Sequence, residues 1–358
     1  MKKIAQVLYS GLGGHGTVAF SLVDGFANKG LKNYLIFYGI EKINKDYIEQ
    51  MELNTKVESY FGIQKKTKSG IKEWLQYYKC LKKIKPDIIL LHSNQLILVS
   101  FIYSLFNKTK IITVEHDAIA VRTKTKWIIS NLNAIFANKI VVLSESYKNH
   151  IKNNLWFKKL LKKYIIIPNG INTSKYKQKE VYFPTDKITI FMASRMNKLR
   201  DHKTLIEAVK LAYTKNKNIQ LRIAGDGDTL LSLQKKYSQL PFVQFLGNIN
   251  ETKIIKELHL ADIYIHATFA ETFSTAILQA MSCALPIVVS DIEGTNHMIS
   301  YEKNGLYFEN ENVLALQNKI SILLNDKKLA LELGKQARED VIKKYNTKLI
   351  TQKYLKLF

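Results

Sequence analysis

The sequence predicts an α/β fold made of two doubly wound parallel-sheet domains. Short apolar runs alternate with helical patterns along the chain, which is typical of parallel strands covered by crossover helices. The alternation occurs in two series that a polar segment separates. A length of 358 residues suits two domains, and a hydrophobic content of 46% is typical of a folded chain.

The two series define the expected domains. In the first series we expect strands in IAQVLYS, YLIFYG, PDIILLHS, KIITVEHD and KIVVLSES. In the second series we expect strands in ITIFMASR, LRIAGDG, VQFLGN, DIYIHAT, PIVVSD and GLYFE. The segment KQKEVYFPTDK interrupts the apolar periodicity between them.

These boundaries give a domain plan in four parts. We expect an N-terminal Rossmann-like domain over residues 1–174, a linker over 175–187, a C-terminal Rossmann-like domain over 188–340, and a C-terminal helix within 341–358 that packs back on the N-terminal domain. Ligands of open parallel sheets bind beyond the carboxyl ends of the strands. The expected site is therefore the cleft between the two domains.

The two cysteines and the apolar runs indicate the cellular compartment of the protein. Cys80 and Cys283 lie far apart in apolar or helical contexts, which indicates thiols in a reducing compartment rather than a disulfide framework. The N-terminal apolar run is short and ends in glycines, so we interpret it as a first strand and not a signal peptide. The longest apolar run, LILVSFIYSLF, is too short to span a bilayer. We expect a cytoplasmic protein without a transmembrane helix.

The net charge of +24 is the most unusual bulk property. It comes from 54 basic and 30 acidic residues, and nearly all the basic residues are lysines. Two interpretations stay open, a lysine-rich background that solvates the surface and attraction to an anionic partner. No nucleic-acid-binding module is recognisable and lysines are spread along the whole chain, so we expect no nucleic-acid partner.

Two segments of the first half combine lysines with aromatic residues at helical spacing. They are KKTKSGIKEWLQYYKCLKKIK and YKNHIKNNLWFKKLLKKY. Basic amphipathic helices with interfacial aromatics suit an anionic membrane surface, although most apolar stripes simply face a core. We expect two helices here, and peripheral binding to the inner face of the cytoplasmic membrane as a hypothesis.

The loop GLGGHGT joins the first strand to a helix. Glycines at such a junction allow backbone amides to approach a phosphate, and the helix N-terminus favours negative charge. Gly11, Gly13 and Gly16 also fit G-x-G-x-x-G, with Glu41 just past the next strand. An NAD(P)-dependent oxidoreductase is therefore the alternative function, and a plain tight turn remains possible.

The second series carries two arginines at the end of its first strand. In ASRMNKLRDHKTLIEA, Arg195 ends the strand and Arg200 precedes a helix, a placement in which two guanidiniums can clamp a diphosphate. The later turn AGDGD holds Asp226 and Asp228 in D-x-D spacing. No other ligand type lies at a recognisable spacing nearby, so we expect a tight turn and no metal.

Two further strand ends carry polar groups. His116 in EHD follows the strand KIITV and is expected to point into the cleft. In ETFSTAILQAMS, Glu271 precedes an expected helix and Gln279 lies two turns along it. A capped helix with an acid near its positive end is the alternative interpretation of this segment.

Taken together, these ordered motifs resemble family 4 of the retaining GT-B glycosyltransferases, of the kind that builds bacterial surface polysaccharides such as capsule or lipopolysaccharide. The motifs are GLGGHGT, EHD, IIPNGINTSKY, ASRMNKLRDHKTLIEA, RIAGDG, QFLGN, ETFSTAILQAMSCALPIVVSD and NGLYFE. The resemblance covers nearly the whole chain. It implies a nucleotide-sugar donor on the C-terminal half, for which we expect a UDP-sugar. It also implies a glycan or lipid-linked acceptor on the N-terminal half, with no metal and no other cofactor.

The resemblance also implies roles for individual residues. Glu271 matches an acid that holds donor-sugar hydroxyls, Arg195 and Arg200 match groups on the diphosphate, and His116 matches a histidine near the anomeric centre. These four are the expected catalytic residues. The expected donor-binding residues are Gly13, Gly14, His15, Gly225, Asp226, Thr272, Phe273, Ser274 and Gln279.

The chain departs from the family pattern at three positions. Arg200 stands where a lysine is usual, and His297 lies in a region where an acid is common. Gln279 replaces a second acid that grips the ribose in the family. A neutral amide forms a weaker hydrogen bond than a carboxylate by about 1 kcal/mol, so we expect a working site. On this basis Gln279→Glu should leave activity intact or tighten donor binding.

Overall fold

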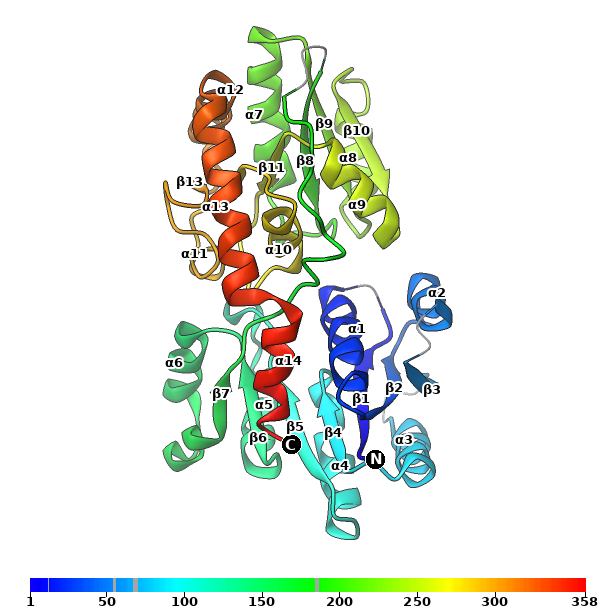
Figure 1. Cartoon of the computed structure of the whole chain (residues 1–358). Coiled ribbons are helices and arrows are strands. Elements are labelled where there is room, and N and C mark those ends of the chain that lie inside the picture. Colours follow the sequence, from blue (N-terminus) through cyan, green and yellow to red (C-terminus); the bar gives the residue numbers. More distant parts are fainter. Residues whose placement is uncertain (12, 54–55, 67–69, 184–186) are drawn as a thin grey trace. The chain divides into compact units, whose positions relative to one another are not determined.

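The computed structural model of the chain describes residues 1–11, 13–53, 56–66, 70–183 and 187–358 (Figure 1). It divides into two compact units. The first unit contains Met1–Gly170 and Thr347–Phe358, and the second contains Ile171–Asn346.

In the described part of the first unit, seven parallel strands form one sheet in the order β3-β2-β1-β4-β5-β6-β7. The strands are β1 (Lys3–Tyr9), β2 (Lys32–Gly39), β3 (Val57–Gln64), β4 (Ile88–Leu91), β5 (Lys110–Val114), β6 (Lys139–Val142) and β7 (Tyr164–Ile166). The α-helices are α1 (Gly14–Ala27), α2 (Lys45–Leu53), α3 (Ile71–Ile84), α4 (Ile97–Leu105), α5 (Lys124–Phe136), α6 (Glu145–Asn154) and α14 (Thr347–Leu355). Short 3-10 turns occupy Asn94–Leu96, Ile119–Val121 and Lys158–Lys163.

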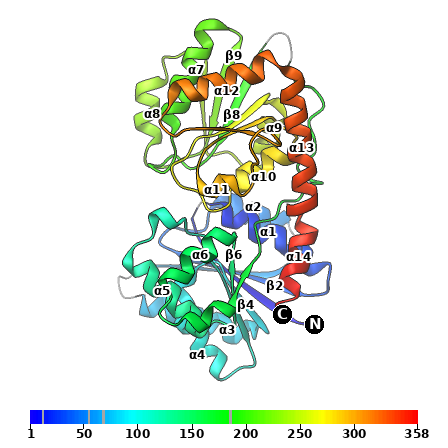
Figure 2. The ribbon, with the colours of Figure 1, turned by 90° about the vertical axis from the view of Figure 1, so that its left-hand side faces the viewer.

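The described part of the second unit has six parallel strands in the order β10-β9-β8-β11-β12-β13. They are β8 (Ile188–Ala193), β9 (Ile219–Ala224), β10 (Val243–Gly247), β11 (Ile263–His266), β12 (Ile287–Ser290) and β13 (Leu306–Phe308). The helices are α7 (His202–Lys215), α8 (Leu230–Tyr237), α9 (Glu251–Leu260), α10 (Thr275–Ser282), α11 (Glu293–Asn296), α12 (Val313–Asn325) and α13 (Lys327–Tyr345). Figure 2 gives a second view of both units.

Helices cover both faces of the first sheet because its strands are buried on both sides. Ala5 and Val7 of β1 belong to the core that contains Tyr77 of α3 and Tyr103 of α4. Leu8 of the same strand belongs to a separate core with residues of α1 and α2. Successive side chains of a strand point to opposite faces, so continuous apolar runs predict this two-sided burial. The predicted fold class, two doubly wound parallel sheets, is confirmed.

The strand order reverses between β1 and β4 in one sheet and between β8 and β11 in the other. At such a reversal the two flanking loops leave in opposite directions and open a crevice at the carboxyl ends of the strands. The loops after β8 and β11 contain Arg195 and Glu271, and those after β1 and β5 contain Gly13 and His116. In the second unit, Arg195 and Glu271 follow the two strands that flank the switch point. In the first unit, Gly13 follows β1, which flanks it, and His116 follows β5, one strand further along the sheet.

The prediction of a single helix in YKNHIKNNLWFKKLLKKY is wrong. Helix α6 ends at Asn154, a 3-10 turn covers Lys158–Lys163, and β7 begins at Tyr164. The side chain of Asn131 accounts for the break, because its Nδ2 donates to Asn154 O at 3.1 Å and its Oδ1 accepts from Trp156 N at 2.7 Å. These bonds satisfy backbone groups that a continuing helix would use. The other predicted basic helix corresponds to α3, and residues 67–69 before it lie outside the described residues.

The segment predicted as a linker is packed on the second unit in its described part, residues 175–183. Lys179 is only 3% exposed, and its Nζ lies 3.1 Å from Asp262 Oδ1. Asp262 also accepts from the backbone amides of Phe183 and Thr189, at 2.8 and 2.9 Å. Residues 184–186 of the predicted linker lie outside the described residues.

The C-terminal residues 347–358 belong to the first unit, where α14 packs on α1. The ring of Phe26 contacts those of Tyr354 and Phe358, with centroids 6.4 and 5.2 Å apart. Among the helices that the structure describes, none combines the length and apolar character required to cross a bilayer.

Candidate active site

Glu271 lies at the centre of a hydrogen-bond network just after β11. Its Oε2 accepts from Arg200 Nη2 at 3.1 Å and lies 3.2 Å from His266 Nε2, and its Oε1 accepts from the Thr272 amide at 3.0 Å. The side chains of Glu271 and Arg200 are each 13% exposed. Burial raises the pKa of Glu271, but Arg200 and His266 outweigh burial and hold this pKa at about 2. The carboxylate is therefore ionised at neutral pH.

Arg200 is fixed from several sides. Its Nη1 donates to Thr268 Oγ1 at 2.6 Å and to Ala270 O at 2.7 Å, while Nη2 contacts Glu271. A guanidinium forms such multiple bonds because its donors are planar and fixed in direction. In the structure Arg200 holds Glu271 and the loop before it, a role that the diphosphate clamp expected from the sequence did not include.

Arg195 differs from Arg200 in its surroundings. It follows β8, the strand next to β11, and its side chain is exposed. Among the described residues the Arg195 side chain has no hydrogen-bond or ion-pair partner. This guanidinium is consequently available to an anionic ligand, as the sequence predicted for a diphosphate contact.

His266 is a site residue that the sequence analysis did not identify. It is the last residue of β11 and is buried, and its Nδ1 lies 3.2 Å from the hydroxyl of Tyr264. Burial lowers its pKa although Glu271 acts in the opposite direction. A neutral His266 with its proton on Nε2 can donate to Glu271, while the Tyr264 hydroxyl donates to Ala193 O at 3.3 Å. A histidine directly at the end of a buried strand, five residues before Glu271, was the available sequence signal.

The loop from Thr272 to Ser274 is buried and begins α10. Ser274 caps the helix, since its Oγ accepts from the Ile277 amide at 3.3 Å. Phe273 packs edge-on against Tyr345, with centroids 5.2 Å apart. The Thr272 amide already donates to Glu271, so the backbone of this loop orients the carboxylate.

The side chain of Gln279 is hydrogen-bonded to another part of the second unit. Its Nε2 donates to the hydroxyl of Tyr176 at 2.8 Å, and that hydroxyl donates to Glu251 Oε1 at 2.9 Å. Neither Tyr176 nor Glu251 was singled out in the sequence, because the three residues lie far apart along the chain. This contact changes what a substitution of Gln279 is expected to do.

The turn after β9 contains Gly225 and Asp226. Gly225 has φ +140°, and a Cβ there would lie 1.8 Å from Ser194 O, so only glycine fits against the loop that leads to Arg195. Asp226 O accepts from the Met196 amide at 2.9 Å, while its exposed carboxylate accepts from the Gly227 amide. The turn thus shapes the Arg195 loop. In the described part of the chain, no group of three or more His, Cys, Asp or Glu side chains is placed to hold a metal ion.

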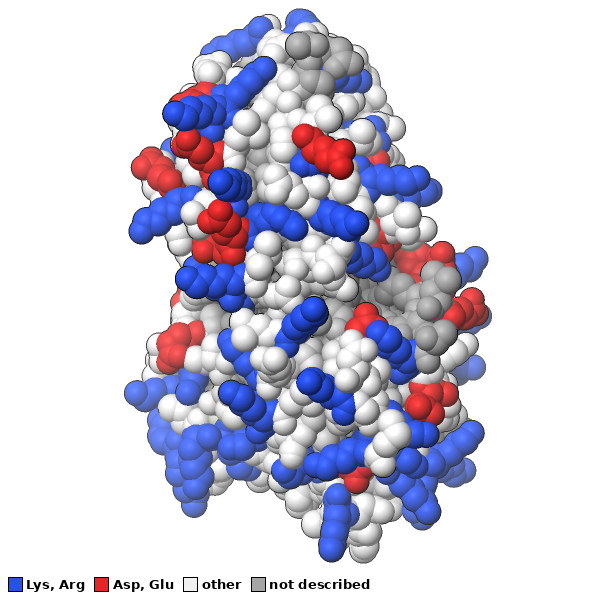
Figure 3. Space-filling model, viewed as in Figure 1, with Lys and Arg blue, Asp and Glu red and all other residues white. Residues whose placement is uncertain are grey.

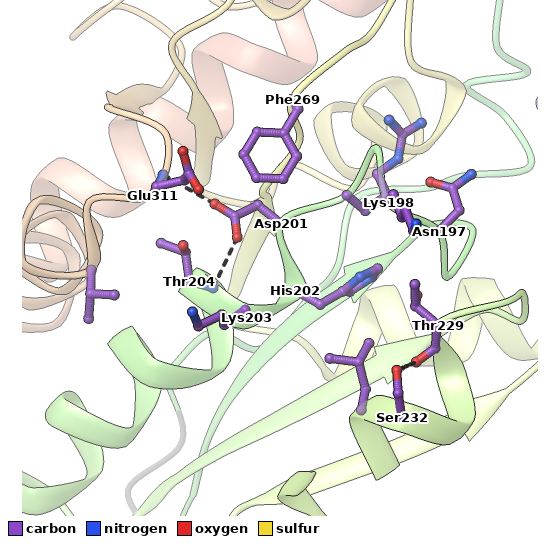
Figure 4. Close-up of a pocket in the computed structure, with 13 residues that line it drawn as sticks. Asn197, Lys198, Asp201, His202, Lys203, Thr204, Thr229, Ser232, Phe269 and Glu311 are labelled. Atoms are coloured by element: carbon purple, nitrogen blue, oxygen red, sulfur yellow. Dashed lines mark hydrogen bonds between the residues drawn. The ribbon is translucent and has the colours of Figure 1, made fainter. Parts of the chain in front are cut away.

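A cavity of about 330 Å³ lies at the N-terminus of α7, next to Arg200 of the Glu271 hydrogen-bond network (Figure 4). Asp201 caps α7 by accepting from the Thr204 amide at 3.1 Å, and its other oxygen accepts from the Glu311 amide at 3.2 Å. Arg200 lines the cavity, but Arg195 and Glu271 do not. The cavity is therefore adjacent to the predicted donor residues and does not contain most of them.

In the first unit, three histidines gather at the ends of neighbouring strands. His92 Nδ1 lies 2.9 Å from His116 Nε2, and the two rings stack with centroids 5.2 Å apart. Burial, together with nearby His15, lowers the pKa of His116 to about 3, so this ring is neutral. His92 was not predicted, although HS follows β4 just as EHD follows β5.

The glycine loop of the first unit begins α1. Gly13 is the N-cap residue, Gly14 is the first residue of the helix, and Leu12 lies outside the described residues. His15 Nε2 lies 3.1 Å from Tyr9 O, and Tyr47 donates to Gly13 O at 3.0 Å. The predicted residues Gly13, Gly14 and His15 follow β1, and His15 is close enough to His116 to lower its pKa. His297 is half-buried in the second unit, and its position gives no account of its replacement of an acid.

Gly294 gives a test of how tightly Glu271 is placed. A Cβ at Gly294 would lie 2.0 Å from Glu271 O, a backbone atom that cannot move away cheaply. We expect Gly294→Ala to displace Glu271, to cost about 1–3 kcal/mol of stability and to weaken ligand binding. Thermal unfolding and ligand titration measure both effects. Gly30→Ala is the comparison, since nothing lies within 4 Å there but its φ of +74° strains any side chain, so it should lose stability without losing ligand affinity. Equal ligand affinity in the two variants would contradict the prediction.

Two family models match adjoining parts of the chain. Residues 12–175 match the model described as Glycosyltransferase Family 4, and residues 174–340 match Glycosyl transferases group 1. Together they cover both switch points and all the predicted site residues.

Two curated relatives carry activities in their names. The N,N'-diacetylbacillosaminyl-diphospho-undecaprenol alpha-1,3-N-acetylgalactosaminyltransferase of Campylobacter jejuni is 29% identical over 235 residues, which is 62% of this chain and 60% of the relative. The poly(ribitol-phosphate) alpha-N-acetylglucosaminyltransferase of Staphylococcus aureus is 30% identical over 247 residues, or 68% of this chain and 48% of the relative. The chain thus matches less than two thirds of the length of either relative.

Solved structures show the same fold. HepE of Anabaena, in complex with UDP and glucose, has a TM-score of 0.82 at 16% identity, covering 99% of this chain and 98% of HepE. TarM of Staphylococcus aureus has a TM-score of 0.77 at 17% identity, covering 100% of this chain and 98% of TarM. At these identities the similarity concerns the fold alone.

Proposed function

Because the chain belongs to the glycosyl transferases group 1, with a first half of the Glycosyltransferase Family 4 type, we propose that it transfers a sugar from a nucleotide-sugar donor to a glycan or lipid-linked glycan acceptor in surface-polysaccharide biosynthesis. The names of the relatives from Campylobacter jejuni and Staphylococcus aureus support this class of acceptor. A capsular polysaccharide glycosyltransferase, CapM, is 23% identical over 238 residues.

The observation that carries the proposal is the ionised Glu271 after β11 together with the exposed Arg195 after the neighbouring strand β8. A carboxylate held by Arg200 and His266 is positioned to accept hydrogen bonds from sugar hydroxyls. Arg195 on the adjacent strand end can stabilise the negative charge that develops on a departing nucleoside diphosphate. The two groups together match the sugar and the diphosphate of a nucleotide-sugar.

We further propose a UDP-sugar donor, transfer with retention of configuration, and no metal or other cofactor. A structure of HepE contains UDP-glucose, which supports the choice of base. Arg195 can neutralise diphosphate charge without a divalent ion. No structural observation favours the alternative of an NAD(P)-dependent oxidoreductase. The match of the second half to a glycosyltransferase model also accounts for a domain that this alternative leaves unexplained.

A donor screen tests the proposal. Thermal unfolding with UDP-, GDP- and ADP-sugars, without added metal and with EDTA, should show stabilisation by one base class. Hydrolysis or transfer of that donor, with the anomer of the product determined by NMR, then tests the activity and its stereochemistry. If no nucleotide sugar stabilises the protein while NADH does, the proposal fails.

The acceptor side suggests contact with a membrane. Lysines are prominent on the face of the first unit visible in Figure 3. Several apolar side chains of this unit are at least half exposed. They lie on α3 (Ile71, Leu75), on α4 and at the residue after it (Ile102, Leu105, Phe106), and after α6 (Trp156, Phe157). Exposed apolar side chains among lysines suit insertion into an anionic surface. We propose peripheral binding at the cytoplasmic face, with Cys80 and Cys283 as free thiols.

We expect the protein to co-sediment with vesicles containing anionic lipid at low salt, and to dissociate as salt screens the charges. Phe106→Ser should weaken this binding. Because the Phe106 side chain is 76% exposed, its removal should change the stability of the fold little. Leu231→Ser is the matched control, since Leu231 is 80% exposed but lies on α8 of the second unit. Equal binding to neutral and anionic vesicles would refute electrostatic attachment.

A further inference from the structure

A chain of hydrogen bonds links three separate segments of the second unit. It runs from Gln279 on α10 through Tyr176, near the start of the unit, to Glu251 at the first position of α9. Tyr176 is 1% exposed, so its hydroxyl is a buried link between the two other side chains. Lys175 also forms an ion pair with Glu251 Oε2.

The donor-to-acceptor direction of these hydrogen bonds is fixed by the chemistry of the two end groups. The amide of Gln279 donates to the Tyr176 oxygen, and the single hydroxyl proton of Tyr176 is donated to the Glu251 carboxylate. The carboxylate thus stands at the accepting end, and the amide at the donating end. Gln279 Oε1 has no hydrogen-bond partner within the described part of the chain.

Both ends of the chain are accessible to a ligand. The Glu251 side chain is 21% exposed, and Gln279 is partly exposed on the same face of α10 as Thr275 and Ala276. A carboxylate can accept about four hydrogen bonds, of which the contacts of Glu251 with Tyr176 and Lys175 use two. The chain therefore presents two acceptors, one charged and one neutral, held by a common tyrosine.

We propose that Glu251 supplies the negative charge that position 279 lacks, and that Glu251 and Gln279 together accept hydrogen bonds from the ribose hydroxyls of the donor. This inference rests on the proposed function, namely that the second unit binds a nucleotide-sugar. Two neighbouring acceptors suit the vicinal hydroxyls of a ribose. Tyr176 is a positioning residue, since it acts through the two side chains that it joins.

The same chain reverses the expectation for Gln279→Glu that the sequence alone suggested. A glutamate at 279 could not donate to Tyr176, and two carboxylates would compete for one hydroxyl proton. Like charges sharing a site repel each other. We therefore expect Gln279→Glu to weaken nucleotide binding. Exchanging the two residues, as Gln279→Glu with Glu251→Gln, rebuilds the chain in the opposite direction.

The test uses the full-length protein. The ligands are the nucleoside diphosphate that binds best among UDP, GDP and ADP, and the 2'-deoxy form of that nucleotide. Affinities are measured by calorimetry for the wild type, Glu251→Gln, Gln279→Glu and the exchanged double variant. Glu180→Gln is the matched control, because Glu180 is an exposed acid in the segment of Tyr176 with no hydrogen-bond partner in the described part of the chain. Thermal unfolding of each variant reports whether it is folded.

We expect each single variant to bind the ribonucleotide about five- to tenfold more weakly, and the double variant to recover to within about twofold of the wild type. Glu251→Gln should also lose most of the preference for the ribonucleotide over its 2'-deoxy form. A purely structural role for Glu251 at the start of α9 would lower stability without changing that preference.

Two results would overturn the inference even where Glu251→Gln or the double variant binds more weakly than the wild type. One is an equal loss of affinity for the ribonucleotide and the deoxynucleotide in Glu251→Gln. The other is a double variant whose loss equals the sum of the single losses. If the wild type binds no nucleoside diphosphate, the proposed function fails as well. If it binds one and Glu251→Gln binds it equally well, only this inference fails.

Discussion

Glu271→Gln should reduce kcat/KM by at least about 100-fold, which corresponds to about 2.7 kcal/mol of lost transition-state stabilisation. The wild-type carboxylate accepts on both oxygens, from Arg200 and His266 on one and from Thr272 on the other. A glutamine must turn an N–H group towards one of these donors. The substitution therefore removes the charge and also rotates or displaces the side chain that is proposed to hold the donor sugar.

The same variant should show a changed dependence of stability on pH. The pKa of Glu271 lies at about 2 in the fold against an ordinary value of 4.5, a difference worth about 3 kcal/mol. A depressed pKa contributes stability that is fully present above pH 4.5 and is lost as the pH falls towards 2. Denaturant unfolding between pH 7 and pH 3 should therefore show a steeper loss of stability in the wild type than in Glu271→Gln.

Glu339→Gln is the control for both measurements. Glu339 is an exposed acid on α13, and its side chain forms no hydrogen bond or ion pair within the part of the chain that the structure describes. Its substitution should leave activity and the pH profile unchanged. Undiminished turnover in Glu271→Gln would show that this carboxylate does not contact the sugar.

Arg195→Ala should reduce kcat/KM by about 100- to 1000-fold while leaving the folded state as stable as the wild type. The Arg195 side chain is exposed and has no partner among the described residues, so its removal leaves no buried group unpaired. The loss should appear mainly in kcat, because the guanidinium is proposed to stabilise charge that develops on the leaving diphosphate. Steady-state kinetics and thermal unfolding of the same preparations separate the two effects.

Arg200→Ala gives the contrasting result. Its loss would leave Thr268, Ala270 and Glu271 without their common donor, so stability should fall together with activity. Lys335→Ala removes an exposed cation on α13 and so controls for the loss of a positive charge alone.

A stable, fully active Arg195→Ala would remove Arg195 from the proposed mechanism.

The sequence predicted most of the fold because apolar runs report burial directly. The strands that it missed, β3 and β7, are the two edges of the first sheet. In β3 several side chains are exposed, and β7 has three residues, so neither shows a long apolar run. An edge strand has one neighbour and needs less burial, which weakens its pattern. The broken helix after Asn154 depended on Asn131, a residue 23 positions away.

For the site, the sequence by itself determined which chemical groups are present and at which strand ends they lie. Glu271, Arg195 and Arg200 follow buried strands of the second unit and His116 follows one of the first, and each parallel sheet places such residues at the carboxyl ends of its strands. The tertiary structure alone decided their partners. Arg200 and His266 bind Glu271, and Tyr176 joins Gln279 to Glu251, because hydrogen bonds depend on distances of about 3 Å between side chains distant in sequence. Local sequence patterns carry no record of such distances.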